Sequence, residues 1–517
     1  MIRGRIMNRM ALAMLVGGAA SLSALLYVGG AWQAAGGTEL RSVRVAPAPE
    51  TTIGINLFTL HWYNRQQAFA NMIAQSEWFQ SRGEGWSPMP AGQLDALGWV
   101  KQLEPGQSAT RLLVMPAAPF RPVEVRCTFL GTGQLEADGV VEVTGRGPHS
   151  LDLKLSPTGQ ENEMAWIELT RTDPRDPVRD IDCRKAGTPA SVRFDPEFVN
   201  FVSGFGVLRF MDWQRTNDNL RLTWSQRALP QTSSQSGPAG ASVEDMVDLA
   251  NTVHADAWFT LPFHADEAYV RSFAQLVHQR LDPGSRVYVE LGNEVWNDMF
   301  DATKDAEREG LARGLGEGNA TRAAMERYAE RVTETMRIWT QVFADRPGAL
   351  VRVAATQNAN AGLARMILGF RDTADWVDAL ATAPYVWMDM DAYHAGDTDR
   401  VFAAMPAAIE KSLDMAGEQR EIAAQYGKRY ITYEAGQHLV TPDMALARAV
   451  QRDPRMGQAY ARYLTEWRDR FGDTMMLYAS TAPISEYGSW GLREYGGQPI
   501  AEAPKYQAVH RFLEASH

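Results

Sequence analysis

The stretch FGVLRFMDW, residues 205–213, begins the part of the sequence that decides the fold. A short run of apolar, β-branched and aromatic residues is typical of a buried strand. The amphipathic pattern VEDMVDLANTVH at residues 243–254 follows it and is typical of a helix. A strand followed by a helix predicts a parallel sheet whose neighbouring strands are connected by helices.

The same order is found on both sides of this stretch. Further strand-like runs occupy residues 51–58, 258–263, 287–291, 350–355, 379–384, 430–433 and 475–479. Helical patterns separate them, near residues 66–79 and at 267–281, 320–343, 361–370, 403–426, 457–471 and 505–513. The resulting eight units predict a (β/α)8 TIM barrel of the α/β class. An open doubly wound sheet is the alternative, but no G-x-G-x-x-G follows an early strand.

A different pattern interrupts the barrel after its first unit. Residues 122–131, 139–147, 150–157 and 164–172 are short alternating segments separated by turn residues. They predict an all-β sandwich inserted in the barrel. We therefore expect the first βα unit at residues 50–86, the inserted β-sandwich at 87–194 and the remainder of the barrel at 195–517. Cys127 and Cys183 both lie in the insert, where they either form a disulfide or remain buried thiols.

The N-terminus has the pattern of an export segment. Arg3, Arg5 and Arg9 precede an apolar run from residue 11 to about residue 32. The run is longer than a typical signal-peptide core and close to the length that spans a bilayer. We expect residues 1–36 to be a signal peptide or an N-terminal membrane anchor. The rest of the chain is then periplasmic or extracellular, either released or held at the inner membrane.

Composition excludes several classes of function. The 62 acidic residues outnumber the 51 basic ones, and the net charge of −11 argues against a nucleic-acid partner. The sequence contains no H-E-x-x-H, cysteine cluster or G-x-S-x-G, so we expect neither a metal nor a cofactor nor a serine nucleophile. The 15 tryptophans suit both core packing and stacking on sugar rings.

Two glutamates follow strand-like runs and enter loops. Glu294 lies in VYVELGNEVWN, residues 287–297, and Glu434 in RYITYEAGQH, residues 429–438. In a TIM barrel the reactive groups stand at the C-terminal ends of the strands. Two carboxyl groups on either side of a glycosidic bond are sufficient to hydrolyse it, one as acid and the other as nucleophile or base. The pair therefore predicts a glycoside hydrolase acting on a polysaccharide or oligosaccharide.

These residues resemble the signature of glycoside hydrolase clan A, the retaining TIM-barrel glycosidases. Gly292-Asn293-Glu294 and Tyr433-Glu434 are the matching segments, and the resemblance covers residues 51–86 and 195–515. It implies Glu294 as acid/base, Glu434 as nucleophile and Asn293 as donor to the sugar 2-hydroxyl. It is specific for the clan and assigns no family within it.

The resemblance also implies further substrate-binding residues. Arg209 matches an arginine that keeps the nucleophile ionised, although an ion pair with Asp212 is equally compatible with its position. The other candidates follow their strands into loops: His264, Tyr385, Trp490 and, beside Glu294, Trp296. The residues that either complete the cleft or pack the core are His61, Trp62, Trp213, Gln357 and Asn358.

Three functions remain open at this point. The first is hydrolysis, the second is transglycosylation that remodels an envelope polysaccharide or exopolysaccharide, and the third is carbohydrate binding without turnover. The presence of both glutamates and of Asn293 favours catalysis. The sandwich either binds sugar through Phe129 and Trp166 or forms a wall of the cleft, and its lack of an aromatic row favours the wall.

Overall fold

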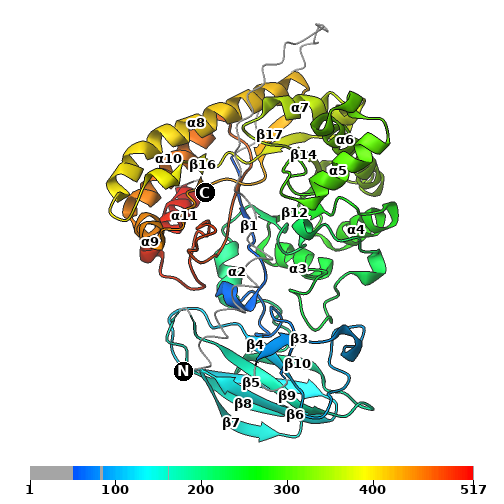
Figure 1. The fold of residues 1–517 in the computed structure, drawn as a ribbon, viewed down its shortest axis with the longest axis vertical. Helices are drawn as coiled ribbons and strands as arrows, with labels where there is room; N and C mark the ends of the chain where they lie inside the picture. Colours follow the sequence, from blue (N-terminus) through cyan, green and yellow to red (C-terminus); the bar gives the residue numbers. More distant parts are fainter. Residues whose placement is uncertain (1–50, 82–84, 161, 516–517) are drawn as a thin grey trace.

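The computed structural model describes residues 51–81, 85–160 and 162–515. A large barrel domain with helices around it lies next to a smaller domain built mainly of strands (Figure 1). Residues 1–36, for which we expect an export segment, lie outside the described residues. Within the described ranges, none of the helices is both long and apolar enough to cross a membrane.

The barrel contains eight parallel strands. Their order in the sheet is β17, β15, β14, β13, β12, β11, β1 and β19. The first and last strands of this order approach each other, since the Thr432 N–H donates to the Thr474 carbonyl at 3.1 Å and the Tyr478 N–H to the Ala435 carbonyl at 2.9 Å. The predicted TIM barrel is confirmed, and the open doubly wound sheet is wrong. In chain order the strands are β1 Ile53–Asn56, β11 Val207–Arg209, β12 Asp256–Leu261, β13 Val287–Leu291, β14 Leu350–Ala355, β15 Ala379–Thr382, β17 Arg429–Thr432 and β19 Met475–Leu477.

Helices surround the barrel and bury their apolar faces against it. Phe273 of α4, for example, packs against Phe259 of β12 and Trp339 of α6, with ring centroids 5.2 and 6.1 Å apart. The barrel interior is also filled, with Trp258 and Tyr288 stacked 5.1 Å apart. A filled interior leaves only the ends of the strands for a reactive site. The helices are α2 Pro196–Val202, α3 Val243–Val253, α4 Glu267–Arg280, α5 Asp301–Ala312, α6 Ala320–Val342, α7 Ala361–Leu368, α8 Thr398–Gln425, α9 Met444–Arg452, α10 Pro454–Arg470 and α11 Pro504–Ala515.

The inserted domain consists of two antiparallel sheets that share one apolar core. One sheet has the order β10-β5-β8-β7 and the other β3-β2-β4-β9-β6. Cys127 and Cys183 face each other on the adjacent strands β5 and β10 and form a disulfide. The strands are β2 Phe79–Ser81, β3 Trp86–Pro88, β4 Ser108–Leu113, β5 Val123–Leu130, β6 Gly133–Gly139, β7 Val141–Gly147, β8 Ser150–Leu155, β9 Ala165–Thr172 and β10 Arg179–Lys185.

The helix expected near residues 66–79 is wrong. This segment is a loop, and the first α-helix after β1 is α2, which follows the insert. Side chains of the segment bond to backbone groups: Gln75 accepts from the Ala68 N–H at 2.6 Å, and Asn71 accepts from the Cys183 N–H at 3.0 Å. Its apolar residues are divided between two cores, Phe69 in that of the barrel and Met72 in that of the sandwich. Their helix-like spacing therefore reflects a connection between two domains.

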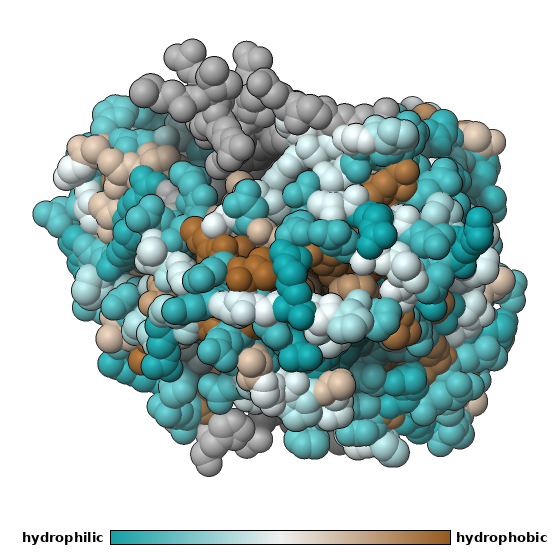
Figure 2. Space-filling view, turned by 90° about the horizontal axis from the view of Figure 1, so that it is seen from below, coloured by the Kyte–Doolittle hydropathy of each residue, from teal (hydrophilic) through white to brown (hydrophobic). Residues whose placement is uncertain are grey.

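The sandwich is fixed to the loop that follows β11. Arg111 of β4 is fully buried, and its Nη2 donates to the carbonyls of Ile73 at 2.6 Å and Ser233 at 2.7 Å. The Ser233 N–H in turn donates to the Leu97 carbonyl at 2.7 Å. The surface seen from the sandwich end is mostly hydrophilic, with hydrophobic side chains in small patches (Figure 2).

Candidate active site

The segment after β13 presents Glu294 at the C-terminal end of the barrel. Gly292 and Glu294 both have left-handed backbone, with φ of 62° and 47°. A side chain at position 292 would lie 2.5 Å from Val295 Cγ2, so the turn requires glycine there. A non-glycine residue with positive φ is costly and is typical of functional sites. Glu294 is only 3% exposed.

Arg209, at the end of β11, connects the residues of the site. It is fully buried, and its Nη1 donates to Glu434 Oε1 at 3.0 Å and to Asn56 Oδ1 at 2.8 Å. Its Nη2 donates to Asn293 Oδ1 and to Glu290 Oε2, both at 2.9 Å. One guanidinium thus holds two carboxylates and the amide beside Glu294 in fixed positions.

Glu434 receives a hydrogen bond at each carboxyl oxygen. Arg209 donates to Oε1, and the Tyr385 hydroxyl donates to Oε2 at 2.8 Å. Burial raises the pKa of Glu434, while the charge of Arg209 and the Tyr385 hydrogen bond counteract the rise. Both donors stabilise the ionised form of this carboxyl.

Glu294 has no arginine partner among the described contacts. Tyr433 donates to its Oε1 at 3.1 Å and Asn297 to its Oε2 at 2.9 Å. Burial, followed by the charge of Glu434, raises the pKa of Glu294 to about 8. Glu294 therefore retains a proton at neutral pH, whereas Glu434 is held by a cation. A protonated carboxyl beside an ionised one is the pair needed for acid and nucleophile roles.

The alternative partner considered for Arg209 is wrong. Its carboxylate partners are Glu290 and Glu434 rather than Asp212. Asp212 instead accepts a hydrogen bond from the Tyr478 hydroxyl at 3.3 Å.

Trp490 is linked to the residues around Glu434 by His438. Its indole Nε1–H donates to His438 Nδ1 at 3.2 Å, and the two rings stack 5.8 Å apart. The His438 ring lies 5.6 Å from that of Tyr385, which bonds Glu434. Trp296 is half-buried and packs against the core of the barrel.

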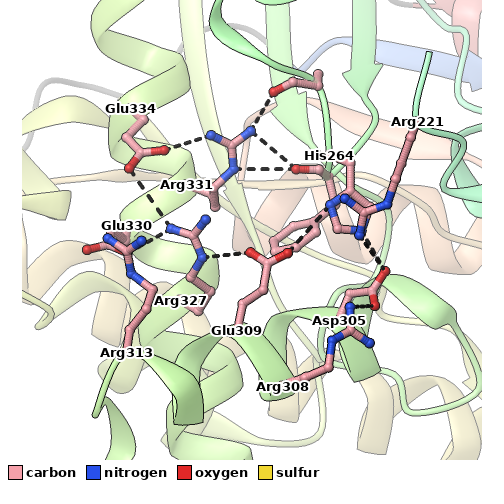
Figure 3. A network of polar contacts seen from close by, with 12 residues as sticks. Arg221, His264, Asp305, Arg308, Glu309, Arg313, Arg327, Glu330, Arg331 and Glu334 are labelled. Carbon is pink, nitrogen blue, oxygen red and sulfur yellow. Dashed lines mark hydrogen bonds and ion pairs between the residues drawn. The ribbon is translucent and has the colours of Figure 1, made fainter.

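His264 belongs to a network of ion pairs with residues of α5 and α6 and does not join the group around Glu294 and Glu434 (Figure 3). Its Nε2 contacts Asp305 Oδ2 at 2.5 Å and its Nδ1 contacts Glu309 Oε1 at 3.6 Å. Arg221 contacts the same ring at 3.0 Å. Its side chain is 5% exposed, and none of its described contacts is with Glu294 or Glu434. The geometry supports a structural role in place of the expected contact with sugar.

The remaining cleft candidates divide into packing and loop residues. Trp213 is buried against Phe198, and Asn358 accepts from the Thr382 hydroxyl, so both are structural. His61 stacks on Tyr63 in the loop after β1, and burial lowers its pKa to about 4. Trp62 lies edge-on to the same ring, and Gln357 is partly exposed after β14.

Several residues of the cluster have no counterpart among the predicted ones. Asn56 ends β1, and Glu290 is a charged residue inside the buried strand β13. A polar residue in an otherwise apolar strand is a usable signal, because an unpaired one is costly. Tyr433 was identified only as the neighbour of Glu434. Tyr478 follows β19 and carried no signal of its own.

Across the described part of the chain, no group of three or more histidine, cysteine, aspartate or glutamate side chains is arranged to hold a metal ion.

No protein-family model and no curated protein matches the chain. Among solved structures it is similar to an α-L-arabinofuranosidase from Thermotoga maritima, with a TM-score of 0.36 and 12% identity over 63% of this chain and 66% of that chain. It is also similar to a xylanase from Cellvibrio japonicus, with a TM-score of 0.33 and 9% identity over 87% and 99% of the two chains. An endo-1,4-β-D-xylanase from Clostridium thermocellum gives a TM-score of 0.37 and 11% identity over 89% and 97%.

Proposed function

We propose that the protein is an exported glycoside hydrolase that cleaves O-glycosidic bonds of a polysaccharide or oligosaccharide with retention of configuration. The observation that carries the proposal is the pair of buried glutamates in opposite environments. Glu434 is bonded to Arg209 and Tyr385, and Glu294 has a pKa raised to about 8. Such a pair supplies an ionised nucleophile and a protonated acid at the same pH.

In the first step the Glu434 carboxylate attacks the anomeric carbon. The bond from that carbon to the leaving oxygen breaks, and the Glu294 proton moves to that oxygen. The product is a glycosyl ester on Glu434 and an ionised Glu294. Once Glu434 is esterified its negative charge is gone, which removes one of the causes that raise the pKa of Glu294.

In the second step Glu294 acts as base. It takes a proton from water while the water oxygen attacks the anomeric carbon, and the ester bond to Glu434 breaks. Both glutamates return to their starting states. Arg209 and Tyr385 keep the Glu434 carboxyl in one orientation through both steps.

The two carboxyls are linked through shared neighbours, and this supports a retaining mechanism. Tyr433, adjacent to Glu434 in sequence, bonds Glu294, and Arg209 bonds both Glu434 and the Asn293 side chain. Retaining enzymes need carboxyls about 5 Å apart, whereas inverting ones need room for a water between them.

Two features support export. The arginine-flanked apolar run at the N-terminus has the pattern of an export segment. The Cys127–Cys183 disulfide suits an oxidising compartment such as the periplasm or the outside of the cell.

A panel of polysaccharides and aryl glycosides tests the proposal with three proteins. The parent is expected to release reducing sugar from at least one glycan, and Glu434→Gln to lose at least about a thousandfold in kcat. Glu294→Ala is expected to lose far more on poor leaving groups than on activated aryl glycosides, because a good leaving group needs little acid. A folded parent that hydrolyses nothing in the panel, or a Glu434→Gln variant within severalfold of the parent, contradicts the proposal.

A further inference from the structure

A third carboxyl lies at the C-terminal end of the barrel and has no role in the two-step mechanism. Asp212 comes three residues after Arg209, beyond the end of β11, and is half-buried. Its Oδ2 accepts one hydrogen bond, from the Tyr478 hydroxyl at 3.3 Å. No arginine or lysine among the described residues forms an ion pair with it. Burial, followed by the charge of Glu434, raises the pKa of Asp212 to about 7.

A carboxyl in such a place is costly to retain without a partner. Asp212 caps no helix, because its contact with Arg215 is made by its backbone carbonyl. The nearest guanidinium in sequence, that of Arg209, is occupied by Glu290 and Glu434. The carboxyl therefore has acceptor capacity that the protein itself does not use.

β11 is two places from both β13 and β19 in the ring, and the hydrogen bond from Tyr478 places the Asp212 carboxyl on the β19 side, away from the acid. In the ring of eight strands β19 is four places from β13, so Tyr478 after β19 lies across the barrel mouth from Glu294 after β13. β11 is two places from β19, and Asp212 reaches Tyr478 over β1. Since Glu294 protonates the leaving oxygen, the leaving group lies on the β13 side. The ring attacked by Glu434 then extends toward Asp212 and Tyr478.

Asp212 and Tyr478 form a wall of the barrel mouth, and two further aromatic rings pack against it. Tyr478 packs edge-on against Phe58 at 6.3 Å and against Trp490 at 5.9 Å. Sugar rings present apolar C–H faces and polar edges, so a wall that combines aromatic rings with one carboxyl suits them.

We propose that Asp212, oriented by Tyr478, recognises the glycone, with its carboxyl accepting hydrogen bonds from hydroxyl or ammonium donors on the ring that Glu434 attacks. This inference rests on the proposed function and adds the residue that selects the sugar. A hydroxyl and a protonated amine share the required chemistry, because both donate to a carboxyl oxygen.

The inference is tested by combining the Asp212→Asn variant with substrate analogues that each lack one hydroxyl group. The 4-nitrophenyl gluco-, galacto-, manno- and xylopyranosides identify the preferred glycone, and its monodeoxy and aminodeoxy analogues then remove or replace each donor. Asp212→Asn is expected to lower kcat/KM about tenfold to hundredfold on the parent glycoside. On the one deoxy analogue that lacks the bound donor the same variant is expected to lose no more than about threefold. An aminodeoxy analogue that exceeds the parent identifies the donor as ammonium, and the reverse order identifies it as hydroxyl.

Asp218→Asn is the matched control. Asp218 lies in the same loop and pairs with Arg215 at 2.6 Å, so this variant removes one negative charge without touching Tyr478. It is expected to keep kcat/KM within about twofold. Tyr478→Phe is expected to lower kcat/KM as Asp212→Asn does, but by less, because the carboxyl remains. An Asp212→Asn loss that is equal on every analogue overturns the inference, since a general effect on Glu434 would act on all substrates alike.

A binding measurement separates this inference from the proposed function. Gluco-, galacto-, manno- and xylo-configured iminosugars are titrated calorimetrically into the parent and Asp212→Asn proteins. If the parent binds one of them at least tenfold more tightly than the variant does, glycone recognition stands even if no glycan is hydrolysed. Equal binding by the two proteins, or no binding by the parent, overturns it.

Discussion

Arg209 is bonded to two buried carboxylates, and this arrangement sets the charge balance of the site. Glu290 is fully buried beneath it and also accepts from the Trp258 indole at 2.8 Å. Removing one partner of a buried ion pair leaves the other charge desolvated, which costs more than the pair contributes. Both the stability of the protein and its catalytic activity are therefore expected to depend on Arg209.

Arg209→Met is expected to lower the free energy of unfolding by about 3–5 kcal/mol and kcat by at least about a hundredfold. The double variant Arg209→Met/Glu290→Gln is expected to recover part of the stability but none of the activity. Chemical denaturation followed by fluorescence measures the first effect. Arg352→Met, which removes a partly exposed pair with Asp378, is the control and is expected to cost about 1 kcal/mol or less. Equal costs for the two arginine variants contradict this account of the site.

The raised pKa of Glu294 predicts how stability changes with pH. The folded protein holds this proton up to about pH 8, whereas the unfolded chain releases it near the ordinary glutamate pKa of 4.5. The stabilisation is therefore complete below about pH 4.5 and is lost as the pH rises through about 8. Glu294→Gln cannot ionise, so it is expected to gain stability relative to the parent across this window, by at least about 1 kcal/mol at its upper end. Denaturation at pH 5 and pH 8.5 measures the difference, and a gap that stays constant or narrows argues against a buried protonated acid.

Sequence predicted the residues whose position after a strand has a defined chemical use. Glu294, Glu434 and Tyr385 follow strand-like runs, and Arg209 lies within one. In the structure Arg209 and Tyr385 bond Glu434, and Tyr433, the neighbour of Glu434, bonds Glu294. The parts played by Glu290, Asp212 and Tyr478 depend on which strands lie near one another around the ring. That information is absent from any single stretch of sequence. His264 also follows a strand, but it pairs with Asp305 of α5, a helix outside the eight predicted βα units.

At the scale of elements, the eight barrel strands were predicted because each is a nearly continuous apolar run. α5 stands outside the eight predicted βα units because its sequence, DATKDAEREGLA, is mainly charged and its apolar face is narrow. Residues 66–79 were predicted as a helix but form a loop. Their apolar residues pack into two different cores, and their spacing resembles that of one helix face. β16 Val386–Trp387 was also missed, since two residues carry no periodicity.

β16 positions one exposed tryptophan beside the site. Trp387 is paired in register with His438 of β18 Gln437–His438, and the His438 ring lies 5.6 Å from that of Tyr385. The Val386 N–H donates to the Gly436 carbonyl at 2.8 Å, which fixes this strand next to the Glu434 segment. Trp387 is 42% exposed, and we expect its ring to stack on a sugar ring beyond the one that is cleaved.

Trp387→Ala is expected to raise KM for the polysaccharide or long oligosaccharide substrate about fivefold to tenfold, with little effect on aryl monoglycosides. The reason is that only a longer substrate extends as far as this ring. Ile500→Ala, which truncates another exposed apolar side chain, serves as the control. Initial rates on substrates of increasing length provide the measurement, and an equal loss at every length would show that Trp387 has no separate subsite.

At the scale of the whole molecule, the sandwich and the barrel are two cores joined by the chain segments at both ends of the insert and by contacts between loops. The segment before β2 contributes to both cores, and Arg111 fixes the sandwich to the loop after β11. The alternating strands predicted the insert. The contact between the domains could not be predicted, because it is made largely by backbone carbonyls, which every residue has.

The disulfide is expected to stabilise the sandwich and to leave the chemistry unchanged. It closes a loop of 56 residues, for which the chain-entropy model gives about 4 kcal/mol. Cys127→Ala/Cys183→Ala is expected to lower the free energy of unfolding of the sandwich by up to about 4 kcal/mol. Activity at 20 °C is expected to stay within about twofold of the parent. Calorimetry and steady-state rates on the same preparations test this. A large loss of activity below the transition would show that the sandwich shapes the cleft more directly than proposed.

The claim on which the whole account depends is that Glu434 forms a covalent bond to the sugar. Its most direct test is intact-protein mass spectrometry after incubation with 2,4-dinitrophenyl 2-deoxy-2-fluoroglycosides of the preferred glycone, followed by peptide mapping. The account predicts a mass increase of one fluoroglycosyl unit, located on the peptide that contains Glu434 and absent in Glu434→Gln. An active enzyme that forms no adduct, or an adduct on any other residue, would contradict it.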